Sequence, residues 1–215
     1  MATRIRAATR RDAPFLAWVM LAASRSHLPR GAWDVHVDGP EPRVLAFLER
    51  MAVQPIDSFC RWERFFVAEV DGRPAAALSG YAPRDLATVD PTPAMDAASR
   101  AILGWGKAEL ALAAARLTPF FTCVSEPPVD AWAIEWVATH PDYRRRGLIH
   151  ELLLAATRAG RERGHSDSQI LVLIGNTPAQ CAYERAGYRV VDNKRHPDFA
   201  RLIGCPGIAR MTRAL

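Results

Sequence analysis

The sequence feature that most restricts the fold is an apolar stretch, a turn and an apolar-striped segment that follow one another in residues 132–163. Trp132–Thr139 has the composition of a β-strand. His140-Pro141-Asp142 is typical of a turn. Arg146–Arg163 has apolar residues at helical spacing and is closed by Gly164, which predicts an amphipathic helix. A strand that leads directly into a helix predicts a sheet with helices packed against it.

The remainder of the chain extends this pattern. Asp71-Gly72 predicts a tight turn between two strands. Together the segments predict an α/β (α+β) fold, in which a mixed central sheet of about seven strands is flanked by helices. The other expected strands are Ile5–Ala8, Phe65–Val70, Pro74–Tyr81, Gln169–Gly175, Tyr188–Asp192 and Ile208–Arg213, and the other expected helices outside residues 84–128 are Ala13–Ser26, Glu41–Ala52 and Pro178–Ala186.

Residues 84–128 depart from this alternation because they are rich in alanine and proline. Met95–Leu117 predicts a helix that Gly104 and Gly106 weaken locally. We interpret residues 84–128 as a helical insertion before the strand Trp132–Thr139, within a single domain that spans residues 1–215. Two roles are left open for the insertion, a lid over a cleft and the surface of a homodimer.

The balance of charge favours an anionic ligand. The net charge is +5 and the isoelectric point is about 9.4, and lysine occurs only at Lys107 and Lys194, so arginine supplies nearly all of the positive charge. Arginine binds phosphate through a planar fork of donors. A surplus of this size is modest for nucleic-acid binding, which is therefore not expected.

Cysteine usage and hydropathy predict a cytoplasmic chain without a metal. No C-x-x-C pair and no Cys/His cluster with zinc spacing occurs. The apolar run Ala13–Ala23, which follows Arg10 and Arg11, loosely resembles a leader peptide, but its spacing favours an amphipathic helix. No run reaches the roughly 20 apolar residues that cross a bilayer, so no membrane partner is expected.

The start of the helix near residue 147 has the properties of an anion site. The first N–H groups of a helix lack intrahelical partners and lie at its positive end, where a phosphate can accept several bonds. Gly147 allows the backbone to approach a ligand closely, and Arg144, Arg145 and Arg146 add charge-assisted bonds. The alternative interpretation of these residues is a solvated basic turn, followed by an amphipathic helix, that binds no anion. The spacing differs from G-x-x-x-x-G-K-S/T, which argues against a nucleotide P-loop.

Two motifs lie in register in the C-terminal half. The first, V-x-x-H-P-x-Y-R-x-x-G-L, runs from Val137 to Leu148 and contains the shorter pattern R/Q-x-x-G-x-G/A, from which Ile149 departs at the last position. The second, N-x-x-A-x-x-x-Y-x-x-x-G-F/Y, matches Asn176, Ala179, Tyr183, Gly187 and Tyr188. Both resemble motifs of the GNAT superfamily of acetyl-CoA-dependent N-acetyltransferases. The resemblance covers most of the chain outside residues 84–128, and it implies a GNAT-like sheet.

The resemblance also implies acetyl-CoA as the co-substrate and an amine as the acceptor. The backbone of residues 137–139 would pair with the pantetheine arm, residues 145–150 would surround the pyrophosphate, and Asn176 would bond the arm near its thiol end. The implied cofactor-binding residues are Val137, Ala138, Thr139, Arg144, Arg145, Arg146, Gly147, Leu148, Ile149, His150, Asn176, Ala179 and Tyr183.

Two side chains are candidates for the chemistry. The resemblance implies that Tyr183 donates a proton to the departing sulfur, and the alternative is a tyrosine that only packs on the sheet. The glutamate that some relatives carry five residues before the asparagine is missing, because Leu171 stands there. Glu135 is the better candidate for the base, and strand alternation predicts that it shares a face with Val137. Its alternative role is a residue that faces water or pairs with an arginine.

The sequence does not determine the acceptor. The predicted function is transfer of an acetyl group from acetyl-CoA to a primary amine of a small molecule or a protein. A non-catalytic acetyl-CoA sensor and a transferase for a bulkier acyl-CoA are the alternatives. Candidates for residues that border the acceptor are His27, His36, Trp33, Asp34, Trp62 and Trp105.

Overall fold

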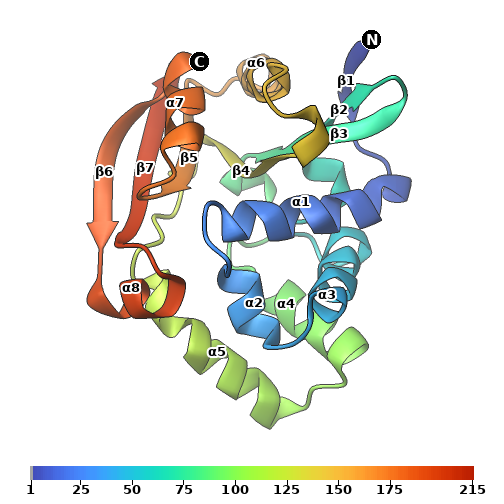
Figure 1. The fold of residues 1–215 in the computed structure, drawn as a ribbon, viewed down its shortest axis with the longest axis vertical. Coiled ribbons are helices and arrows are strands. Elements are labelled where there is room, and N and C mark those ends of the chain that lie inside the picture. Colours follow the sequence, from blue (N-terminus) through green and yellow to red (C-terminus); the bar gives the residue numbers. More distant parts are fainter. Residues whose placement is uncertain (1) are drawn as a thin grey trace.

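The computed structural model describes residues 2–215, which form a seven-stranded mixed sheet with helices on both faces (Figure 1). The strand order is β1-β2-β3-β4-β5-β7-β6, with β4 and β5 parallel and the other neighbouring pairs antiparallel. The predicted α/β (α+β) sheet is therefore confirmed. The strands are β1 (Thr3–Ala7), β2 (Phe65–Val70), β3 (Arg73–Tyr81), β4 (Trp132–Thr139), β5 (Asp167–Leu173), β6 (Arg189–Arg195) and β7 (Gly207–Ala214).

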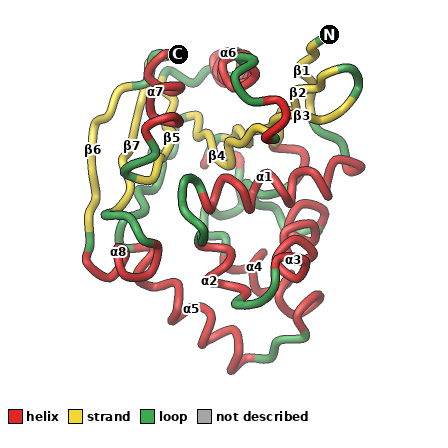
Figure 2. Tube along the Cα trace, viewed as in Figure 1, coloured by secondary structure: helices red, strands yellow, loops and turns green. Residues whose placement is uncertain are grey.

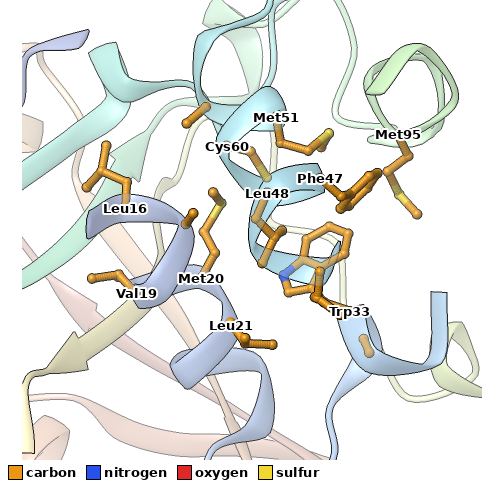
Figure 3. Close-up of a cluster of buried hydrophobic side chains, with 14 of the residues drawn as sticks. Leu16, Val19, Met20, Leu21, Trp33, Phe47, Leu48, Met51, Cys60 and Met95 are labelled. Carbon is orange, nitrogen blue, oxygen red and sulfur yellow. The ribbon is translucent and has the colours of Figure 1, made fainter. Parts of the chain in front are cut away.

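Hydrophobic residues gather in a core on each face of this sheet. The α1-side core includes Leu16 and Met20 of α1 and Phe47 and Leu48 of α3, which meet between the two helices (Figure 3). The α6-side core packs α6 and α7 against the opposite face. Figure 2 shows that α2, α4 and α5 gather beyond the sheet, on the side of α1. The helices are α1 (Ala13–Arg25), α2 (Ala32–Val37), α3 (Glu41–Val53), α4 (Thr92–Ala98), α5 (Lys107–Phe121), α6 (Leu148–Glu162), α7 (Thr177–Arg185) and α8 (Pro197–Ile203).

Local backbone conformation corrects two of the predicted helices. The helix expected from Arg146 begins at Leu148, because Gly147 has a φ of 77° and lies outside the helical region. The helix expected over Met95–Leu117 is interrupted: α4 is followed by one π-helical turn, Ser99–Leu103, which Gly104 ends at a φ of 71°, and α5 begins at Lys107. The short helices α2 and α8 were not predicted.

Within residues 2–215, no helix combines the length and the apolar composition that a bilayer crossing requires.

A partly buried ion pair fixes the start of α1 to the edge of the sheet. The carboxylate of Asp12 accepts two hydrogen bonds of 2.8 Å from the guanidinium of Arg6. It also accepts bonds from the backbone N–H and the hydroxyl of Thr9, at 2.7 and 2.9 Å. Because Asp12 is only 7% exposed, its removal leaves several donors without a partner.

We expect Asp12→Ala to lower the free energy of unfolding by about 2 kcal/mol, measured by denaturant unfolding. The control is Asp130→Ala, which removes the exposed Arg84–Asp130 pair and should change stability by less than about 0.5 kcal/mol. Equal effects of the two substitutions would show that the buried pair contributes no more than a surface pair.

Candidate active site

The site lies where two parallel strands separate. β4 and β5 pair only at Trp132 with Ser168, Ala133 with Gln169 and Ile134 with Ile170. β4 continues to Thr139 and β5 to Leu173, but beyond Ile134 and Ile170 the two strands no longer pair with each other. Figure 1 shows β4 running in a different direction from β5, β7 and β6. A cavity of about 730 Å³ opens at the point of separation, and both strands line it.

A bulge in β4 changes which side chains face the α1-side core. Trp136 has a φ of 54°, and the register with β3 shifts so that Glu135 lies opposite Ser79 and Ala138 opposite Ala77. Ala138 packs against the α1-side core, whereas Val137 packs against the α6-side core. Ile134 is buried in the α6-side core, so Glu135, the next residue, points to the other face of β4. The prediction that Glu135 and Val137 share a face is therefore wrong, because the bulge interrupts the alternation.

Glu135 lines the cavity, and its backbone pairs with Ser79 of β3. Its carboxylate has no hydrogen-bond or ion-pair partner among residues 2–215. No arginine pairs with it, so that alternative role does not describe Glu135, whose side chain is of intermediate exposure. Burial raises the pKa of Glu135 from 4.5 to about 7. A carboxylate with a pKa near neutrality can both accept and release a proton at physiological pH.

Tyr183 of α7 also lines the cavity and is 6% exposed. Burial, and then the nearby negative charges of Glu135 and Tyr188, raise the pKa of Tyr183 above its ordinary value of 10.0. The phenol therefore keeps its proton at neutral pH. A protonated phenol and a titratable carboxylate thus line one cavity, as acid–base catalysis requires.

The loop before α6 contains two residues with left-handed backbone, Arg145 at a φ of 61° and Gly147 at 77°. The first helical hydrogen bond at this end joins the N–H of Glu151 to the carbonyl of Gly147, so the amides of residues 148–150 precede the helical pattern. Amides without helical partners at the positive end of a helix can bind an anion.

Some of the residues predicted to bind acetyl-CoA line the cavity, and others lie outside its lining. Arg144 and Ile149 line it, together with Val137, Ala138 and Thr139 of β4. Arg145, Arg146, Gly147 and His150 are exposed outside its lining, and the side chain of Leu148 is buried in the α6-side core. Because its side chain is buried, Leu148 can offer a ligand only its backbone groups.

Asn176 is the N-cap of α7 and lines the cavity. Its Oδ1 accepts a hydrogen bond of 3.2 Å from the N–H of Ala179, and its Nδ2 donates one of 2.6 Å to the hydroxyl of Ser26. The side chain therefore ties α7 to the end of α1. Ser26 itself has a φ of 58°, a strained conformation for a residue other than glycine.

The model of the acetyltransferase (GNAT) family matches residues 38–188. The chain belongs to the GNAT acetyltransferase family. The predicted family and the predicted transferase class are thereby confirmed. No curated protein matches the sequence.

Solved structures share the GNAT fold with this chain. An N-acetyltransferase from Staphylococcus aureus is 18% identical, with a TM-score of 0.65, over 97% of this chain and 99% of the other. The ribosomal-protein-S18-alanine N-acetyltransferase from Escherichia coli is 17% identical, with a TM-score of 0.52, over 99% and 94%. The PaiA N-acetyltransferase from Thermoplasma acidophilum, in complex with coenzyme A, is 11% identical, with a TM-score of 0.50, over 100% of both chains.

In the structure of this GNAT protein, some of the residues predicted to border the acceptor line the cavity and the others do not. His27 and Trp33 line the cavity. His36 does not, because it is buried beside Ser99, to which its Nε2 lies at 3.0 Å, and burial lowers its pKa to about 4. The remaining candidates, Asp34, Trp62 and Trp105, lie outside the cavity lining.

Several other residues that line the same cavity were not predicted from the sequence. They are apolar or aromatic and come from segments far apart in the chain, so no local motif marks them. They include Phe59, Tyr81, Leu117 and Phe120. Among residues 2–215, no group of three His, Cys, Asp or Glu side chains is placed to hold a metal ion.

Proposed function

We propose that this GNAT protein transfers an acetyl group from acetyl-CoA directly to a primary amine. The observation that carries the proposal is the shared cavity. It is lined by the strand edge that β5 leaves unpaired, by the buried phenol of Tyr183 and by the unpartnered carboxylate of Glu135. These are the groups that binding a thioester arm, protonating a thiolate and deprotonating an amine require.

The residues present fit acetyl-CoA in two ways. The edge of β4 after Ile134 can bond an extended arm as an added strand would, because β5 does not pair with it. The amides of residues 145–150 would hold the pyrophosphate, with Arg144, Arg145 and Arg146 adding positive charge.

The chemistry follows from two proton transfers. Glu135 accepts the proton that the amine loses as its nitrogen bonds to the acyl carbon. Tyr183 donates a proton to the sulfur as the carbon–sulfur bond breaks. The products are an amide and free coenzyme A, and the two side chains then exchange protons with water to return to their starting states.

We also infer a cytoplasmic location, where thiols stay reduced. It is supported by the four cysteines, which are all free: Cys60, Cys123, Cys181 and Cys205.

We expect Gly147→Ala to raise the Kd for acetyl-CoA about tenfold, the equivalent of about one lost hydrogen bond. A methyl group strains the left-handed backbone there and moves the amides of the loop. Gly72→Ala is a matched control, because Gly72 has the same φ of 77°, also has nothing within 4 Å of the added carbon, and lies outside the cavity lining.

Both substitutions should lower stability by about 1 kcal/mol, and only Gly147→Ala should change the affinity for acetyl-CoA in a calorimetric titration. An unchanged affinity in Gly147→Ala would contradict the proposed pyrophosphate site.

The function itself is tested by release of free thiol from acetyl-CoA with a panel of primary amines. Release that depends on the amine, and that is faster with acetyl-CoA than with butyryl-CoA, is the expected result. Acetyl-CoA at about 100 times its Kd should also stabilise the fold by about 2.7 kcal/mol. Stabilisation without thiol release from any amine would support the sensor alternative, and faster release from butyryl-CoA would support the bulkier acyl group.

A further inference from the structure

Four aromatic rings form a continuous file along one side of the cavity. Tyr81 stacks on Phe59 with centroids 5.2 Å apart, and Phe59 stacks on Trp136 at 6.0 Å. Trp136 in turn contacts Trp33 at 5.3 Å. The rings come from β3, the loop before β2, β4 and α2, and all four line the cavity.

The bulge in β4 connects this file to the proposed base. Glu135 immediately precedes Trp136, and its negative charge lies near enough to Tyr81 to raise the pKa of that phenol, after burial as the larger cause. A group that lies along the rings therefore reaches the carboxylate without leaving the cavity. The residues between β3 and β4 add further apolar surface, with Met95 from α4 and Leu117 and Phe120 from α5.

Carboxylates outnumber basic side chains in the cavity lining. Glu135, Asp90 and Glu126 supply carboxylates. Among the described residues that line the cavity, Arg144 is the only arginine or lysine, and it belongs to the loop before α6. His27 is the one histidine among the described residues of the lining. An acceptor that carries a carboxylate or phosphate would therefore place a negative charge in the cavity without a strong cationic partner, which costs binding free energy.

We propose that the acceptor is an arylalkylamine, a primary amine on a short chain attached to a flat aromatic body that carries no carboxylate or phosphate. This proposal rests on the proposed function and specifies its substrate. The aromatic body packs against the half-buried rings of Phe59 and Trp136, behind which Trp33 and Tyr81 are buried, and the amine reaches Glu135. The carboxylates attract the ammonium form, and the absence of a paired cation excludes amino acids with the same ring.

The test compares three acceptors that differ by one feature each, in the thiol-release assay with acetyl-CoA. Phenethylamine has the ring and the amine, butylamine lacks the ring, and phenylalanine adds a carboxylate. We expect kcat/KM for phenethylamine to exceed that for butylamine by at least about tenfold and that for phenylalanine by at least about 100-fold.

Two variants test the residues. Phe59→Leu should raise KM for phenethylamine at least about fivefold and leave KM for butylamine unchanged, because it removes one ring of the file. Glu126→Arg, on an exposed side chain, should improve phenylalanine relative to phenethylamine by supplying a cation. The control is Leu112→Ala, on an exposed apolar residue of α5 outside the cavity lining, which should change neither preference.

The outcomes separate the two proposals. Turnover of butylamine or phenylalanine that equals or exceeds turnover of phenethylamine overturns the arylalkylamine assignment and leaves amine acetylation standing. Failure of every amine, phenethylamine included, to release thiol overturns both. The expected order of acceptors, with loss of the ring preference in Phe59→Leu alone, supports both.

Discussion

Replacing Glu135 by glutamine is expected to lower kcat/KM by about 100-fold or more at pH 8, with little change in the Kd for acetyl-CoA. Glutamine keeps the size of the side chain but cannot accept the proton of the amine. Because burial raises the pKa of Glu135 to about 7, the activity of the natural protein should rise with pH up to about pH 7 and then level off. That rise should be absent in Glu135→Gln, apart from the titration of the acceptor itself.

Although Glu135→Gln should lower activity, it should not lower the stability of the fold at pH 8. Below about pH 4.5 the carboxyl is protonated in both the folded and the unfolded chain, so its contribution does not change with pH. Between pH 4.5 and about 7 only the folded state holds the proton, and stability therefore falls as the pH rises. At pH 8 Glu135→Gln avoids this penalty and should be at least as stable as the natural protein.

A purely structural glutamate would behave differently. Its loss would lower stability and activity together, and the acidic limb of the pH profile would persist. Glu49→Gln, at an exposed position of α3, serves as the control for a change of one charge and should leave both quantities unchanged. Full activity of Glu135→Gln at pH 8 would remove Glu135 from the mechanism.

Replacing Tyr183 by phenylalanine is the second change for which we expect a large effect, a loss of about 100-fold in kcat. The ring and its packing in the α6-side core are kept, so acetyl-CoA binding and stability should change little. Only the proton for the departing thiolate is lost. Because the pKa of Tyr183 lies above its ordinary value, its titration should not limit activity in the neutral range.

Tyr188→Phe provides a matched control for this experiment. Tyr188 is 1% exposed and its hydroxyl lies 2.7 Å from that of Ser168, outside the cavity lining. Removing this hydroxyl should cost about 1 kcal/mol of stability and leave kcat within about threefold of the natural value. The acid role of Tyr183 would be rejected if the two variants retained equal activity.

Much of the fold could be predicted from the sequence because regular hydrophobic patterns decide it. β4 has the predicted bounds, and α1, α3 and the hairpin of β2 and β3 lie within one or two residues of their predicted positions. The two motifs that resemble GNAT proteins also come together at one cavity, because each follows a strand of the separating pair.

Other features could not be predicted, because they depend on an unusual backbone conformation or on contacts between segments far apart in the sequence. A positive φ at Trp136 has no sequence signal, since large aromatic residues rarely adopt it, and it places Glu135 and Val137 on opposite faces. The dual bonding of Asn176, to Ala179 and to Ser26, depends on a contact across 150 positions of the chain. The file of four rings likewise joins segments that no motif connects.

The most direct test of the central claim is a crystal structure of the protein with bound coenzyme A. We predict density for the pyrophosphate at the amides of residues 145–150, and for the pantetheine arm along the edge of β4, with its sulfur close to the hydroxyl of Tyr183. Coenzyme A bound elsewhere, with β4 and β5 still separated and the cavity between them occupied only by water, would contradict this account.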